Sequence, residues 1–115
     1  MVFERNWHKW YAKDVPGAVE IKKDTMPDIL KRTVDKFPDH TAIIYMGKKI
    51  LYKQLERLVN RFAWALKNLG VKAGDKVGMI LPNIPQVVIA NQAVYKIGAV
   101  AVMNNPLYTE KELEK

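Results

Sequence analysis

The apolar and polar positions near the C-terminal end of the chain predict a strand, a helix and a second strand in succession. Val77–Leu81 is a short apolar run of the kind found in strands covered on both faces, and Ala99–Met103 is a second such run. Between them, Val87–Ile97 is apolar around most of its circumference, which indicates a helix buried on several sides. Because crossovers of this kind are right-handed, the two strands are predicted to be parallel neighbours.

Capping and helix-ending residues predict where the helix of this βαβ unit begins and ends. Asn83 is expected to be the N-terminal cap, with Pro85 in the first turn and Gln86 at the reciprocal capping position. Gly98 is expected to end the helix.

Two amphipathic helices are predicted upstream. Thr25 is expected to cap the first, and Pro38 to stop it. The second, Lys53–Leu69, shows steps of three and four over about four turns, and Gly70 follows it as a C-terminal cap. Trp64 points away from its apolar stripe, so it is either exposed or packs against protein outside this chain, and such an aromatic residue more often marks an interface than a ligand site. The stripes consist of Ile29, Leu30, Val34 and Phe37 in the first helix and of Leu55, Leu58, Val59, Phe62, Leu66 and Leu69 in the second.

The remaining segments predict a hairpin and an N-terminal arm. Thr41–Tyr45 and Lys49–Tyr52 are β-rich runs on either side of Gly47, which indicates two antiparallel strands. Residues 1–24 show neither a helical nor a strand period, so we expect an extended arm that lies on the rest of the protein.

A further helix is predicted to begin at the end of the chain. Thr109 and Glu112 have the spacing of a capping box, and the last residue, Lys115, follows within two turns. We therefore expect the chain to be the opening portion of a longer protein.

Composition and charge narrow the class of protein. The chain has 115 residues and a net charge of +7. It has no cysteine, which excludes disulfides and thiolate metal sites. Residues 25–73 carry ten bases and four acids, but no aromatic residues alternate with these bases, so a solvated basic surface is favoured over a nucleic-acid interface. No apolar run reaches the roughly 18 residues of a membrane span. We expect a cytoplasmic protein, with peripheral membrane contact left open.

The residue types that carry chemistry form no catalytic set. His8 and His40 have no partner at a metal-ligand or catalytic spacing, and no pair of carboxylates is placed for acid and base roles. Open α/β folds bind ligands in the crevice beyond the carboxyl ends of parallel strands, which here would be formed by Pro82–Ile84 and Asn104–Tyr108. A helix cap at Asn83 and a turn at Asn104-Asn105-Pro106 are the favoured explanation of these segments. We assign no catalytic, cofactor-binding or metal-binding residue.

The order of these segments resembles a known family. The succession DKFPDHTAIIYMGKKILYKQLERLVNRFAWALKNLGVKAGDKVGMILPNIPQ and then AVYKIGAVAVMNNPLYTEKELE is similar to the N-terminal portion of the acyl-adenylate-forming enzymes. The resemblance runs from about Pro27 to Lys115. It implies an α/β fold, the N-terminal part of the acyl-CoA synthetase fold, with residues 25–115 as a truncated portion of the large N-terminal domain. One departure is Leu51, where the family usually has Thr or Ser before the tyrosine that opens the second helix.

Within this family the opening of the chain is most similar to the long-chain fatty acid CoA ligases. Trp7, Trp10 and Tyr11, followed by Asp14-Val15-Pro16, resemble the start of those enzymes. The resemblance implies that the intact enzyme forms acyl-CoA, AMP and pyrophosphate from a fatty acid, ATP and CoA through an acyl-adenylate. It implies ATP, Mg²⁺ and CoA for the intact enzyme and no bound cofactor for these 115 residues, which lack the family's Ser/Thr/Gly-rich phosphate loop.

Two alternatives remain open from the sequence. The substrate could be an aromatic or short-chain acid instead of a fatty acid. The chain could also be a stand-alone module whose basic segment meets an acidic partner or an anionic membrane. The expected partners are the fatty acid, ATP, CoA and the remainder of the enzyme's own chain, without nucleic acid and with a homodimer left open.

Overall fold

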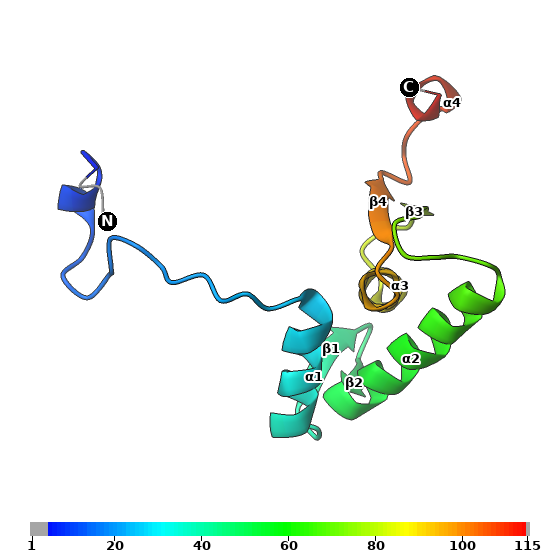
Figure 1. Cartoon of the computed structure of the whole chain (residues 1–115), viewed down its shortest axis with the longest axis horizontal. Helices are drawn as coiled ribbons and strands as arrows, with labels where there is room; N and C mark the ends of the chain where they lie inside the picture. The colour runs from blue at the N-terminus through cyan, green and yellow to red at the C-terminus, as the bar shows by residue number, and fades with distance from the viewer. Residues whose placement is uncertain (1–4, 115) are drawn as a thin grey trace.

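The computed structural model describes residues 5–114, which form an α/β body and a separate N-terminal arm (Figure 1). Its elements are the 3₁₀-helix η1 (His8–Trp10), the helices α1 (Met26–Lys36), α2 (Tyr52–Asn68), α3 (Pro85–Lys96) and α4 (Glu110–Leu113), and the strands β1 (Thr41–Tyr45), β2 (Lys48–Leu51), β3 (Lys76–Ile80) and β4 (Val100–Asn104).

The arm runs away from the body instead of lying on it (Figure 1), so that part of the sequence-based expectation is wrong. Apart from His8, every residue from 5 to 24 is exposed, including Val19 and Ile21 at 79% and 89%. The arm has no periodic apolar face to bury, and this explains why it does not pack. Near its junction with the body, Asp24 forms a salt bridge of 2.9 Å with Arg32 of α1.

The start of α1 is the predicted one. The Thr25 hydroxyl accepts a hydrogen bond from the Asp28 backbone N–H at 3.3 Å, and the Asp28 carboxylate accepts from the Thr25 backbone N–H at 3.0 Å. This reciprocal pair satisfies two N–H groups that the first turn of a helix leaves without partners. Val34 is the buried anchor of α1 in the core.

The hairpin is also as predicted. Strands β1 and β2 pair antiparallel, with Ile43 opposite Ile50 and Tyr45 opposite Lys48. Met46 and Gly47 form the connecting turn, and both have positive φ, as a twisted two-residue hairpin turn requires.

Helix α2 supplies much of the core. Leu55, Val59 and Leu66 of the predicted stripe are buried, together with Ala63. The other stripe residues, Leu58, Phe62 and Leu69, are 37%, 41% and 82% exposed, so that part of the expectation is wrong. Trp64, which lies off the stripe, is 68% exposed. At its start, Leu51 has no oxygen to cap the helix, yet the Gln54 side-chain Oε1 still accepts from the Leu51 backbone N–H at 2.9 Å. The bond to the Gln54 side chain, one of the two hydrogen bonds of a capping box, is therefore present at the start of α2 although residue 51 has no hydroxyl to make the other.

The βαβ unit is confirmed. Strands β3 and β4 pair parallel, in register from Lys76 opposite Val100 to Ile80 opposite Asn104. Ala93 and Val94 of α3 are completely buried, where α3 packs against α2 and one face of the strand pair.

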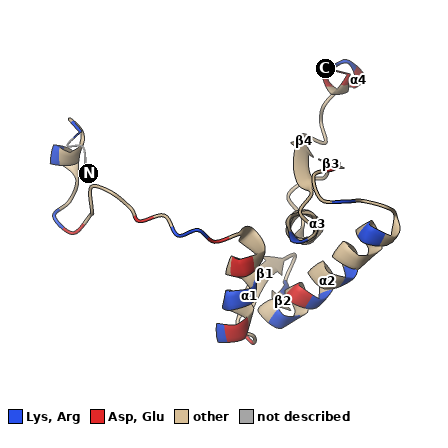
Figure 2. Cartoon of the chain, viewed as in Figure 1, with Lys and Arg blue, Asp and Glu red and all other residues tan. Residues whose placement is uncertain are grey.

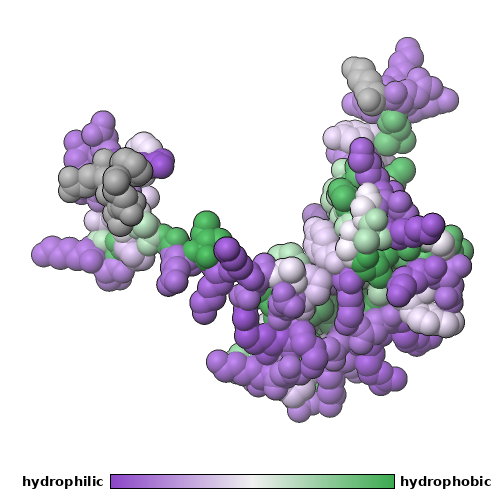
Figure 3. Space-filling view, viewed as in Figure 1, coloured by the Kyte–Doolittle hydropathy of each residue, from purple (hydrophilic) through white to green (hydrophobic). Residues whose placement is uncertain are grey.

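The expectation that these strands are covered on both faces is wrong for the described residues. On the second face Ile80 and Val100 are 52% and 48% exposed. Figure 3 shows the hydrophobic surface gathered over the part of the molecule that holds α3, β3 and β4, while α1 and α2 present a mainly hydrophilic exterior.

Candidate functional site

The carboxyl ends of β3 and β4 bring the two segments selected from the sequence to one edge. Because Ile80 lies opposite Asn104, the segments Pro82–Ile84 and Asn104–Tyr108 leave the sheet side by side. The Asn104 side chain lies next to Gly78, whose missing Cβ would be 4.0 Å from its Nδ2. The same Nδ2 donates to the carbonyl of Val102 at 3.2 Å.

The segment after β4 is a hydrogen-bonded turn. The side-chain Oδ1 of Asn105 accepts from the Leu107 N–H at 3.0 Å, and its backbone carbonyl accepts from the Tyr108 N–H at 3.0 Å. Both acceptors of Asn105 are therefore used inside the turn, which is the structural explanation considered from the sequence.

The segment after β3 does not supply the predicted cap. Helix α3 begins at Pro85 with Ile84 as its N-terminal cap residue and no side-chain cap hydrogen bond, so the assignment of Asn83 as cap is wrong. Gln86 consequently lies one position before the place where a reciprocal cap would form. Proline favours the first helical position because it lacks the N–H that would otherwise have no partner there, and this sets the start one residue later.

This edge does not fit Mg-ATP. Neither Pro82–Ile84 nor Asn104–Tyr108 contains a charged residue, whereas a triphosphate with its metal needs cationic groups and carboxylates. Within residues 5–114 no group of three acidic or histidine side chains is placed to hold a metal ion. We derive no chemical step at this edge.

The two histidines lie in aromatic surroundings on the surface. His40 stacks on Phe37 with ring centroids 5.0 Å apart, and His8 lies 5.4 Å from the Tyr11 ring. Neither position brings a histidine to the carboxyl edge of β3 and β4.

The groups with shifted pKa values mark helix starts and surface ion pairs. Hydrogen bonds from the Thr25 hydroxyl and N–H lower the pKa of Asp28, and those from the Thr109 N–H and hydroxyl lower the pKa of Glu112. The Asp35 carboxylate raises the pKa of Lys31. Such shifts belong to caps and ion pairs and do not point to an active site.

Two polar atoms inside the apolar helix were not singled out from the sequence. Among the described residues, Asn91 Oδ1 and Gln92 Oε1 are buried without a hydrogen-bond partner. Lys96, at the end of this helix, donates to Asn60 Oδ1 of α2. The signal in the sequence was the interruption of an otherwise apolar helix, because a buried polar side chain usually has a partner.

No described helix is both long and apolar enough to cross a bilayer. Lysine and arginine residues are spread along the arm, α1 and α2 (Figure 2), which agrees with a solvated basic surface.

The parallel βαβ unit, the hairpin and the two amphipathic helices define an α/β protein. Residues 30–115 match the family model described as AMP-binding enzyme, so the chain belongs to that family.

Individual relatives extend this result. The chain is 37% identical over 114 residues to a long-chain-fatty-acid–CoA ligase of Bacillus subtilis. This alignment covers 99% of the chain and 20% of the relative. The chain thus spans about a fifth of the length of the curated relatives that it matches.

Solved structures of the family share the fold. The N-terminal subdomain of Klebsiella oxytoca NpsA in complex with 3-hydroxyanthranilyl-AMSN is 32% identical with a TM-score of 0.77, over 78% of this chain and 23% of that one. The anthranilate CoA ligase AuaEII in complex with anthranoyl-AMP is 30% identical with a TM-score of 0.75, over 79% of this chain and 18% of that one. The fold is therefore the N-terminal part of an adenylate-forming enzyme.

Proposed function

We propose that this chain is the N-terminal scaffold of a long-chain fatty acid CoA ligase. In this proposal residues 1–24 are its arm and residues 25–115 begin its large N-terminal domain. The intact enzyme joins a fatty carboxylate to the α-phosphate of ATP with release of pyrophosphate. The CoA thiol then displaces AMP from the acyl-adenylate.

The extent of the match to long-chain ligases supports this substrate class. The Bacillus subtilis relative covers 99% of the chain, so the similarity includes the arm that precedes the family match at residue 30. The arm carries Trp7, Trp10 and Tyr11, the residues on which the resemblance to long-chain ligases rests.

The chain's own contribution is structural. Its α3 and strand pair form a core that other parts of the enzyme would extend, and the carboxyl edge of that pair carries no charge. ATP, Mg²⁺ and CoA are therefore assigned to the intact enzyme and not to these residues alone.

Fatty-acid-dependent exchange of pyrophosphate into ATP tests the proposal. The protein that carries this chain at its N-terminus should catalyse the exchange with palmitate, and residues 1–115 alone should not. Calorimetric titration of residues 1–115 with Mg-ATP should show binding no tighter than millimolar. Micromolar binding, or exchange by the 115 residues, would contradict the scaffold role.

An aromatic acid is the second candidate substrate. The solved relatives named above are complexes with 3-hydroxyanthranilyl-AMSN and anthranoyl-AMP and are 32% and 30% identical to this chain. The same exchange assay with anthranilate in place of palmitate separates the two candidates.

A further inference from the structure

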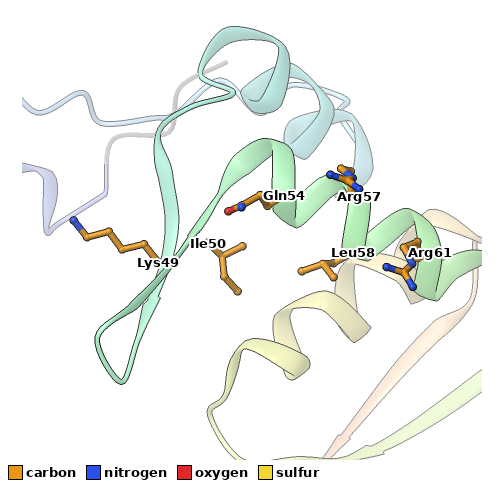
Figure 4. A pocket seen from close by; sticks show the side chains of 6 residues that line it. All are labelled: Lys49, Ile50, Gln54, Arg57, Leu58 and Arg61. Atoms are coloured by element: carbon orange, nitrogen blue, oxygen red, sulfur yellow. The ribbon is translucent and has the colours of Figure 1, made fainter.

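A hollow of about 290 Å³ lies between strand β2 and helix α2. Figure 4 shows the side chains that line it: Ile50 and Leu58 point into the space between strand and helix, Gln54, Arg57 and Arg61 follow one another along α2, and Lys49 extends away from the two apolar side chains. The lining residues are Lys49, Ile50, Gln54, Arg57, Leu58 and Arg61. None of them belongs to the carboxyl edge of β3 and β4.

The rim of the hollow consists of hydrogen-bond donors. Lys49 comes from the strand, and Arg57 and Arg61 come from successive turns of α2, where residues four apart are neighbours. Gln54 uses its Oε1 to accept from the Leu51 N–H, which leaves its NH₂ group as the end available to a ligand. No carboxylate lines the hollow.

The rim cations are not engaged in ion pairs within residues 5–114. The ion pairs of this part of the chain join Lys31 to Asp35, Arg32 to Asp24 and Lys53 to Asp39, and they include no residue of the hollow. Three cations around one hollow therefore lack a compensating charge from the described residues.

The floor is apolar. Ile50 is partly buried and Leu58 is 37% exposed, so the floor offers aliphatic surface next to the cations. A ligand that satisfies both parts carries a strongly negative group joined to an apolar portion.

We propose that this hollow binds the phosphate monoester group of a small amphiphilic molecule. Arg57 and Arg61 hold the phosphate oxygens, the Gln54 NH₂ adds a donor, and the apolar portion lies over Ile50 and Leu58. Lys49, whose side chain extends away from the floor, contributes positive charge at the edge of the hollow. A phosphate monoester fits better than a carboxylate because it has a charge of about −1.5 to −2 near pH 7 and accepts paired hydrogen bonds from arginine. The ligand class follows from these side chains alone and does not depend on the acyl-CoA ligase activity.

Equilibrium dialysis with hexyl phosphate tests this site. Residues 1–115 should bind hexyl phosphate about tenfold or more tightly than inorganic phosphate, hexanol or hexanoate, since the phosphate and the alkyl chain each contribute. The double variant Arg57→Gln/Arg61→Gln should lose about tenfold or more in affinity, because hydrogen bonds to charged groups typically contribute that much. Lys49→Gln should show a smaller loss.

The matched control is Lys22→Gln/Lys23→Gln, which removes the same net charge from the arm and should leave the affinity unchanged. Equal losses in both double variants would show attraction by net charge and overturn the site. Failure of the wild-type chain to bind hexyl phosphate would also overturn it. Binding to phosphatidylglycerol vesicles that hexyl phosphate does not displace would assign the rim to a lipid surface instead.

Discussion

Thr25 and Asp28 determine where the first helix of the body begins. Replacing Thr25 with alanine removes the hydroxyl that accepts from the Asp28 N–H, and the loss of such a cap costs about 1 kcal/mol. Because α1 buries Val34 in the body, Thr25→Ala should lower the free energy of unfolding in urea by that amount. Thr109→Ala removes the hydrogen bond that the Thr109 hydroxyl donates to the Glu112 carboxylate at the start of α4, which has no buried residue, and should leave the global unfolding unchanged. Equal losses in the two variants would contradict this difference.

The Asp28 carboxylate gives this cap a pH dependence. Its pKa is lowered in the folded protein by hydrogen bonds from the Thr25 hydroxyl and N–H. A carboxyl whose folded pKa lies below its unfolded value of about 3.9 stabilises the fold above that value. This contribution is lost as the pH falls through the folded pKa.

The variant Asp28→Asn keeps an acceptor oxygen but cannot ionise. Wild type should therefore be more stable than the variant at pH 6, and the difference should shrink as the pH falls below about 4. Urea unfolding at several pH values measures it. A difference that stays constant from pH 6 to pH 3 would show that the charge of Asp28 does not contribute.

At the scale of elements, Gly98 lies between the end of α3 and the start of β4 and contacts the loop before β3. Its φ is +75°, and an added Cβ would lie 3.3 Å from the Ala73 Cβ. The Gly74 N–H donates to the Gly98 carbonyl at 2.9 Å, so the two backbones are held close. Gly98→Ala should cost about 1–2 kcal/mol for the left-handed backbone and more for the contact with Ala73.

Gly70 provides the matched comparison, since its φ is +92° and an added Cβ would meet nothing within 4 Å. Gly70→Ala should therefore cost less than Gly98→Ala in urea unfolding. Adding Ala73→Gly to Gly98→Ala should remove the excess. Equal costs at the two glycines would show that the approach to Ala73 is unimportant.

The sequence predicted the elements better than their surroundings. The stripe of α2 and the cap of α1 depend on neighbouring residues, so local spacing was enough to find them. The start of α3 was predicted one residue too early, because Asn83 and Pro85 gave competing signals and the proline prevailed. The apolar runs of β3 and β4 could not predict that the second face of the strand pair is exposed, because the burial of a strand depends on which other elements pack against it.

The candidate site shows the same limit. Parallel pairing brought Pro82–Ile84 and Asn104–Tyr108 together as predicted. The basic hollow was missed because Lys49 and Arg57 come to line one hollow only after β2 turns into α2. The angle between a strand and the helix that follows it has no periodic signature in a single sequence.

At the scale of the whole molecule, the open face of the strand pair predicts self-association. Ile80 and Val100 are about half exposed there, and exposed apolar patches of several hundred Å² tend to associate. Residues 1–115 should form dimers or larger species in light scattering at moderate concentration. Ile80→Lys/Val100→Lys should shift them towards monomer, whereas Val19→Lys in the arm should not. A wild-type chain that stays monomeric at high concentration would contradict this prediction.

The substrate preference of the enzyme that carries this chain tests the proposed function most directly. Each buried methylene contributes about 0.8 kcal/mol, so an acyl site built for long chains should separate them from acetate by orders of magnitude in kcat/KM. The measurement is acyl-CoA formation from ATP, CoA and a panel of palmitate, acetate and 4-coumarate. The account predicts that palmitate is used with the highest kcat/KM and that AMP and pyrophosphate are released. A higher kcat/KM for acetate or 4-coumarate would contradict the assignment to long-chain fatty acids.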